Sequence, residues 1–209
     1  MTQPKPKRSP GRPKNNEQSP SLRETVLNAA SQMFMEYGYE PVSLNQIAER
    51  AGVTKASIYY YFSNKAQLFT DAVTAMMARI CTYTKLILDR EGPLRARLEQ
   101  MAVVKMATTH VEFETMMREA MPALSETQRA AIRRAEHGIH EVLADGFVQA
   151  AEDGEIASTA DPMLLAHAFS ALLLLGNRES DLRETLSGEA LPKMIVDLFW
   201  RGIGPGRPD

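Results

Sequence analysis

Cap signals for short helices constrain most strongly how this 209-residue chain folds. A Ser or Asn followed three residues later by Glu or Gln is typical of a helix N-terminus, because the two residues can satisfy each other's free backbone N–H groups. This spacing occurs at Ser21 and Glu24, at Ser43 and Gln46, and at Asn64 and Gln67. The N-terminal third is therefore predicted to consist of short helices.

The apolar spacing predicts helices in the rest of the chain as well. In the first helix, apolar side chains recur every three or four residues as far as Tyr37, and Gly38 can end it in the left-handed conformation. Further helices are predicted at about 44–51, 55–62, from 65 to the Gly92-Pro93 break, and at about 94–108, 110–121, 126–152, 162–175 and 190–201. No stretch alternates as a strand does, so the fold is predicted to be all-α with about nine helices.

Composition excludes several classes of protein. A single Cys rules out an intramolecular disulfide framework and a Cys-based zinc cluster. The N-terminus is rich in Lys and Pro where a secretory signal has an apolar core. The longest apolar stretch, 163–175, is too short to span a bilayer. We therefore expect a cytoplasmic protein with no membrane partner.

Charge is distributed unevenly along the chain. The formal net charge is −2, yet residues 1–65 hold nine Lys and Arg against five Glu. The N-terminal third is thus basic and the remainder is acidic. Such asymmetry is typical of a protein that meets a polyanion with one end only.

Residues 1–20 are predicted to form a disordered basic arm. They contain five Pro, five basic residues and no aromatic side chain, so they cannot bury enough surface to offset the entropy lost on ordering. Within the arm, Pro10 to Lys14 resembles the core of an AT-hook, in which Arg12 would enter a narrow minor groove. The alternative is a solvated tail without sequence preference.

The segment from Ser43 to Lys65 has the pattern of a helix-turn-helix. Two short predicted helices are joined by a turn at Gly52, and apolar residues on both, such as Ile47 and Ile58, are spaced to pack together. An αα-hairpin inside an ordinary helical core is the alternative interpretation. Three consecutive tyrosines, 59–61, weigh against it, because they cannot all face a core from one short helix.

In a helix-turn-helix, the second helix lies in the major groove of DNA. Lys55, Ala56 and Ser57 would then be nearest the base edges, and the tyrosine hydroxyls suit phosphate oxygens. Lys65 begins the next helix, where its charge and the free N–H groups favour a phosphate. The predicted DNA-binding residues are Ser43, Asn45, Thr54, Lys55, Ala56, Ser57, Tyr59, Tyr60, Tyr61 and Lys65, with Arg12 of the arm.

Residues 38–69, GYEPVSLNQIAERAGVTKASIYYYFSNKAQLF, resemble the DNA-binding signature of the TetR family of bacterial transcriptional regulators. The resemblance covers about residues 22–70, and Ala56 departs from it, because Gly or Pro is common there. The matching residues are Gly38, Tyr39, Ile47, Ala48, Ala51, Gly52, Val53, Thr54, Ile58, Tyr59, Tyr61, Phe62 and Lys65.

The resemblance implies a homodimer that binds double-stranded operator DNA. It divides the chain into a DNA-binding domain at 21–66 and a ligand-binding and dimerisation domain at 67–209, linked by the fourth helix. A small-molecule effector is expected to respace the two DNA-binding domains so that they no longer fit successive major grooves. We therefore expect a repressor that a small apolar or aromatic effector releases from a palindromic operator.

A methionine-rich stretch indicates where that effector would bind. Seven of the 12 Met lie between residues 76 and 121, and Met is frequent at adaptable apolar sites. In the family, the fourth to seventh helices enclose the effector pocket. Ordinary core filling is the alternative for any single Met. The predicted ligand-binding residues are Met77, Met106, His110, Phe113 and Met117.

The last two predicted helices are apolar over a wide arc, which requires more than one packing partner. Burial within one chain would satisfy them. The resemblance favours instead a four-helix interface between two copies. The predicted interface residues are Leu165, Phe169, Leu172, Met194 and Leu198.

No pattern indicates an enzyme. His137, His140 and Glu141 have a loose metal-ligand spacing, but a solvated helix face accounts for them equally, and neither a metal nor a cofactor is expected. No nucleophile motif or phosphate-binding Gly-rich loop is present. Two rival functions remain: a DNA-binding or architectural protein that needs no effector, and an all-helical enzyme that uses the Met-rich cavity.

Overall fold

The computed structural model describes residues 21–107, 113–157, 159–178 and 190–204. These residues form nine α-helices and one 3-10 turn, with no strand among them, so the all-α prediction is confirmed. Arg12 and His110 lie outside the described residues. The elements are α1 (Leu22–Tyr37), α2 (Leu44–Ala51), α3 (Lys55–Tyr61), α4 (Lys65–Leu88), α5 (Leu94–Ala107), α6 (Phe113–Ala120), η1 (Met121–Ala123), α7 (Glu126–Glu152), α8 (Pro162–Arg178) and α10 (Ala190–Ile203).

Side-chain caps set the helix starts where the sequence places them. Ser21 and Ser43 each form both hydrogen bonds of a capping box, and Asn64 Oδ1 accepts the Gln67 N–H at 2.8 Å. α4 ends at Leu88, earlier than predicted, and the Arg97 guanidinium donates to the Leu88 carbonyl at 2.6 Å. Local side-chain chemistry thus decides most helix boundaries.

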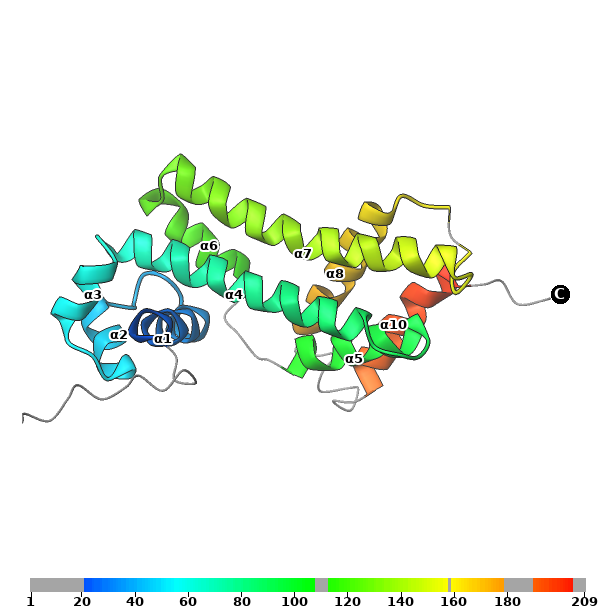
Figure 1. Ribbon diagram of the computed structural model, residues 1–209, viewed down its shortest axis with the longest axis horizontal. Coiled ribbons are helices and arrows are strands. Elements are labelled where there is room, and N and C mark those ends of the chain that lie inside the picture. The colour runs from blue at the N-terminus through cyan, green and yellow to red at the C-terminus, as the bar shows by residue number, and fades with distance from the viewer. Residues whose placement is uncertain (1–20, 108–112, 158, 179–189, 205–209) are drawn as a thin grey trace, which may run out of the picture.

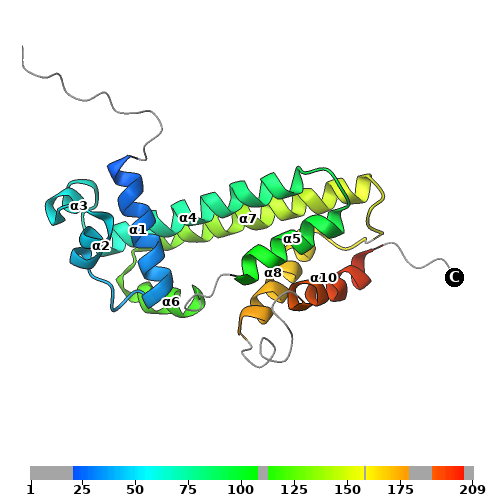
Figure 2. The ribbon, with the colours of Figure 1, turned by 90° about the horizontal axis from the view of Figure 1, so that it is seen from below.

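The two longest helices, α4 and α7, run side by side along the molecule in the same direction (Figures 1 and 2). α1, α2 and α3 gather at one end, where α4 and α7 begin. α5, α8 and α10 gather at the other end, where α4 and α7 finish. α6 lies close to α1 and packs against it (Figure 2).

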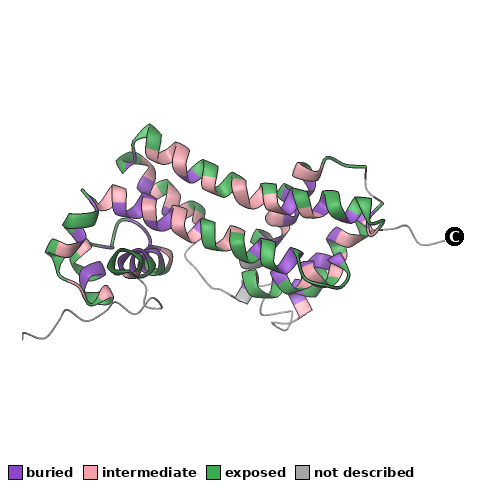
Figure 3. Ribbon diagram, in the orientation of Figure 1, coloured by how far each residue is buried: buried purple, intermediate pink, exposed green. Residues whose placement is uncertain are grey.

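Buried residues form two clusters, which include helices from opposite ends of the molecule. Figure 3 shows buried positions on the helices at both ends. The first cluster, which we call the head cluster, joins α1–α3 and the first half of α4 to α6, to Leu124 just after η1, and to the first half of α7. The base cluster joins the end of α4 to α5, the second half of α7, α8 and α10. From outside the predicted DNA-binding domain, α4 buries Leu68, Phe69, Ala72, Val73 and Met77 in the head cluster, and residues beyond α5 bury Met116, Ala120, Leu124 and Ile132 there.

The division between the two packing clusters therefore falls partway along α4 and α7. On α4, Met77 still belongs to the head cluster and Ile87 belongs to the base cluster. On α7, Ile132 belongs to the head cluster and Phe147 to the base cluster. Because apolar burial is the main stabilising term, the helix-turn-helix depends on α6 and α7 for part of its core.

Substitution of Leu124 by Ala should test this shared core. Leu124 is buried in the head cluster, so the truncation should lower the free energy of unfolding by about 2–5 kcal/mol. Urea unfolding followed by circular dichroism measures it. Leu22→Ala is the matched control, because Leu22 is exposed and should cost less than about 1 kcal/mol. Equal effects of the two substitutions would contradict the shared core.

Candidate nucleic-acid interface

The turn between α2 and α3 is fixed by its backbone. Gly52 adopts the left-handed conformation, with φ at 66°, and ends α2. The Val53 N–H then bonds the Ala48 carbonyl at 2.9 Å. Thr54 begins α3, because its Oγ1 accepts the Ser57 N–H at 3.1 Å. The two short helices are thus held at one angle, as a helix-turn-helix requires.

Apolar contacts beneath α3 hold it against the rest of the head. Ile58 and Phe62 are fully buried in the head cluster. The Arg23 guanidinium lies over the Phe62 ring, 5.5 Å from its centroid, and also bonds Asp71 of α4 at 2.8 Å. α3 is therefore fixed on one side and presents its other side to solvent.

The solvent side of α3 carries the residues expected to meet DNA. Lys55, Ala56 and all three tyrosines are exposed, and Tyr60 is the most exposed of the tyrosines, at 82%. The Tyr60 and Tyr61 rings pack edge to face, with 5.0 Å between their centroids. Lys55 Nζ lies 5.8 Å from the centroid of the Tyr59 ring. This surface combines a cation with phenolic hydroxyls, which suit phosphate and base-edge contacts.

Two of the predicted hydroxyl contacts, Ser43 and Thr54, also serve as helix caps. Ser43 Oγ accepts the Gln46 N–H, and Thr54 Oγ1 lies 2.9 Å from Ser57 Oγ as well as capping α3. Asn45, on the first turn of α2, is exposed. A contact of these hydroxyls with DNA would therefore have to share or replace the capping bonds.

Lys65 has partners within the protein. Its Nζ donates to the Glu40 carbonyl at 3.1 Å and lies 4.2 Å from the centroid of the Tyr39 ring. Burial lowers the pKa of the Lys65 ammonium, and the nearby carboxylates of Glu40 and Glu119 act in the opposite direction. The predicted phosphate contact at Lys65 stays a prediction, and the structure adds a role in holding the α1–α2 turn.

Glu119 is a residue that the sequence pattern did not indicate. It lies on α6, outside the segment that resembles a helix-turn-helix, yet its Oε2 accepts the Tyr39 N–H at 3.0 Å and the Glu40 N–H at 3.4 Å. These amides belong to the turn that leads into α2. Only the three-dimensional packing of α6 on α1 brings the groups together, so no local pattern could have found them.

The predicted ligand-binding residues divide between the two clusters. Met77 is buried in the head cluster, and Phe113 and Met117 pack partly buried against it. Met106 is buried in the base cluster. Phe113 and Met117 also line an open groove of about 460 Å³ beside α6, η1 and α7, lined further by Glu114, Arg118, Met121, Arg129, Ile132, Arg133 and Glu136.

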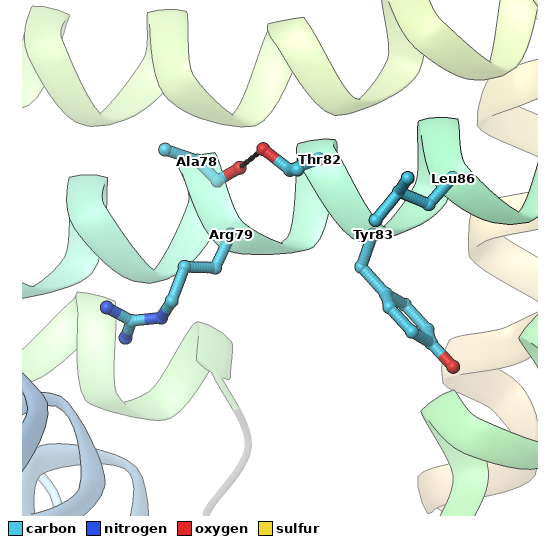
Figure 4. A pocket seen from close by; sticks show the side chains of 5 residues that line it. All are labelled: Ala78, Arg79, Thr82, Tyr83 and Leu86. Atoms are coloured by element: carbon cyan, nitrogen blue, oxygen red, sulfur yellow. Dashed lines mark hydrogen bonds between the residues drawn. The ribbon is translucent and has the colours of Figure 1, made fainter. Parts of the chain in front are cut away.

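A second, shallower hollow of about 340 Å³ lies on α4. Arg79 and Tyr83 extend from the same side of the helix into it, with Leu86 one turn further on (Figure 4). Arg79 Nη2 also donates to Ser31 Oγ of α1 at 3.3 Å, which links the middle of α4 to the head. No pattern in the sequence indicates that these side chains share a hollow.

The predicted dimer residues fall into two groups. Leu165 and Phe169 are buried within the chain, and the Phe169 ring packs on Phe199 at 5.2 Å between centroids. These two side chains serve the intrachain core, because α8 uses one part of its apolar arc against α10 and α7. Leu172 packs partly buried against the base cluster. Met194 and Leu198, one turn apart on α10, are 50% and 62% exposed.

The histidine-rich face of α7 pairs with neighbours rather than gathering around one point. His137 lies 3.5 Å from Glu141, and the His140 ring packs on His167 of α8 at 4.0 Å between centroids. Among the described residues, no group of three or more His, Cys, Asp or Glu side chains is arranged to hold a metal ion. No helix within the described ranges has the length and apolarity needed to cross a membrane.

The capped α2–turn–α3 unit and the exposed face of α3 define a helix-turn-helix DNA-binding protein. Proteins similar in sequence belong to the same class of DNA-binding protein. The family described as "Bacterial regulatory proteins, tetR family" matches residues 26–72. The transcriptional regulator AcuR of Cereibacter sphaeroides is 30% identical over 178 residues, which cover 79% of this chain and 78% of AcuR.

Solved structures share the fold. The reduced form of Escherichia coli NemR matches with a TM-score of 0.73 at 20% identity, over 88% of this chain and 98% of NemR. AibR, solved in complex with isovaleryl coenzyme A and operator DNA, matches with a TM-score of 0.58 at 22% identity, over 85% and 97%. The chain therefore belongs to the TetR family of bacterial transcriptional regulators, as its sequence predicts.

The contact between the His140 and His167 rings predicts a loss of stability in acid. Burial, with the charges of His167 and His137, lowers the pKa of His140 in the folded protein. The unfolded chain then takes up a proton near pH 6.5 that the folded protein resists, so stability should fall as the pH drops below about 6.5. Thermal melting of wild type and His140→Gln between pH 8 and 5.5 measures it.

The glutamine variant should lose less stability over this pH range than wild type. His137→Gln is the matched control, because His137 is exposed and its removal should leave most of the acid loss in place. A wild-type melting temperature that stays constant or rises from pH 8 to 5.5 would refute the assignment.

Proposed function

We propose that this protein is a homodimeric repressor that binds a palindromic operator through α3 and leaves it when a small apolar or aromatic effector binds. The observation that carries the proposal is the exposed face of α3, with Lys55 and the three tyrosines held outward over a buried Ile58. We assign DNA binding to residues 21–66, effector binding and dimerisation to 67–209, and an accessory role to the arm with Arg12. The protein acts in the cytoplasm.

The assignment of DNA contacts follows from the position of each side chain in the helix-turn-helix. Lys55, Ala56 and Ser57 form the first turn of α3 and meet base edges. Tyr59, Tyr60 and Tyr61 contact phosphates and sugars, and Asn45, with the Ser43 cap, reaches the backbone across the groove. A palindromic operator follows from the two-fold symmetry of a dimer with one such head in each subunit.

The effector assignment rests on the groove beside α6. Phe113, Met117 and Ile132 supply apolar surface there, and polar groups stand around it, as in many small-molecule sites. AibR was solved with both an acyl coenzyme A and operator DNA, which supports a ligand-responsive function for a protein of this fold. Met77 lies in the same cluster as Phe113 and Met117, and we include it in the site.

The dimer assignment rests on exposed apolar side chains of the last two helices. Leu164 on α8, and Met194 and Leu198 on α10, are all at least half exposed in the single chain. Large apolar side chains in such numbers at one end of a helical body are typical of a surface that another protein covers. A second copy of the chain is the partner that a symmetric operator requires.

Replacing Lys55 by Ala should weaken operator binding. We expect about a tenfold loss of affinity, because a base contact of this kind contributes roughly 1–3 kcal/mol of discrimination. The probe is a duplex selected by the wild-type protein from random-sequence DNA, and fluorescence anisotropy measures its affinity. Lys85→Ala is the matched control, because Lys85 is an exposed lysine near the far end of α4. The assignment fails if Lys55→Ala binds as tightly as Lys85→Ala does.

Replacing Leu198 by Glu should dissociate the dimer. A charge on a buried interface leucine should weaken the dimer by at least about thirtyfold and remove operator binding with it. Light scattering measures the mass in solution. Leu86→Glu, at an exposed leucine of α4, should remain dimeric. A folded Leu198→Glu protein with wild-type mass would refute this placement of the interface.

A further inference from the structure

The peptide between Tyr39 and Glu40 is held from two sides. Glu119 Oε2 on α6 accepts the Tyr39 N–H at 3.0 Å and the Glu40 N–H at 3.4 Å. On the other side, Lys65 Nζ at the start of α4 donates to the Glu40 carbonyl at 3.1 Å. Side chains of two helices thus replace the backbone partners that this turn lacks.

The neighbouring Gly38 makes room for the carboxylate. It has a φ of 86°, and a Cβ built there would lie 2.8 Å from Glu119 Oε2. Any larger residue would strain the backbone and displace the carboxylate. The Tyr39 ring adds a third restraint, because it packs edge to face on Phe69 of α4 at 4.9 Å between centroids.

This turn sets where α2 begins. Only Pro41 and the buried Val42 separate Glu40 from Ser43, which caps α2. Because α2 packs on both α1 and α3, a displacement of the turn would carry the helix-turn-helix with it. The position of the Glu119 carboxylate on α6 therefore affects how the exposed face of α3 is oriented.

We propose that Glu119 is a positioning residue through which α6 holds the helix-turn-helix in the orientation that binds DNA. The proposal rests on the function proposed above. Met117 and Arg118, the two residues before Glu119, line the groove beside α6. An occupant of that groove that shifts α6 would break first the longer of the two bonds to the turn, and the orientation of α2 would change.

Two conservative variants separate the reach of the side chain from its charge. Glu119→Gln keeps an oxygen acceptor at the same reach and should bind the selected duplex within about threefold of wild type. Glu119→Asp keeps the charge but is one methylene shorter, so it should lose about tenfold in affinity. Glu152→Asp, at an exposed glutamate of α7, is the control and should bind as wild type does. Both Glu119 variants should stay folded by circular dichroism.

Amide hydrogen exchange of the dimer without DNA provides an independent measurement. Exchange at Tyr39 and Glu40 should be about tenfold faster in Glu119→Asp than in wild type or Glu119→Gln. The Gly52 amide, which bonds the Glu49 carbonyl at 3.1 Å, should exchange equally in all three proteins. If Glu119 only stabilised the fold as a whole, its replacement would change the amide exchange rates in the α1–α2 turn and in the α2–α3 turn at Gly52 together.

Wild-type affinity and wild-type exchange in Glu119→Asp would overturn the proposal, and so would a loss of affinity in Glu119→Gln as large as that in Glu119→Asp. If the wild-type protein selects no duplex, the proposed DNA-binding function fails instead. The exchange rates at Tyr39 and Glu40 still test the contact in that case.

Discussion

The rest of the structure depends on the burial of α6 and the first half of α7 against the helix-turn-helix. Met116, Ala120 and Leu124 share one apolar cluster with α1–α4, so the DNA-binding end of the chain is incomplete without them. This packing brings Glu119 to the α1–α2 turn and forms the groove beside α6. The residues that line this groove and the helix-turn-helix therefore belong to one packed unit, and a shift of α6 would cost head-cluster contacts.

The base cluster lies at the opposite end of α4 and α7 from the head cluster. α4 and α7 contribute residues to both clusters. These two parallel helices therefore connect the helix-turn-helix end to α5, α8 and α10. Met194 and Leu198 are exposed on α10, a helix that lies at the opposite end of the molecule from α1–α3 (Figure 1). A dimer formed through the base would fix the distance between two heads, and each head would be oriented by its own α6. Spacing and orientation would then be controlled by different parts of the chain.

Local signals in the sequence predict much of this fold. The caps at Ser43 and Thr54 and the left-handed Gly52 fix the helix-turn-helix, because each acts on backbone within a few residues. Long-range contacts were not predictable in the same way. Glu119 meets Tyr39 across 80 residues of chain, and periodicity cannot say which neighbour a wide apolar helix buries. Leu165 and Phe169 thus fill the chain's own core, and Met77 and Met106 lie in different clusters.

A crystal structure of the protein on a duplex that it selects from random-sequence DNA tests most directly how α3 and Glu119 act. We expect a dimer that places each α3 in a major groove, with Lys55 and Ser57 at base edges and the three tyrosines at the DNA backbone. We also expect Glu119 to accept the Tyr39 N–H in that complex. A complex in which DNA contacts a surface other than α3, or in which Glu119 has left the α1–α2 turn, would contradict both assignments.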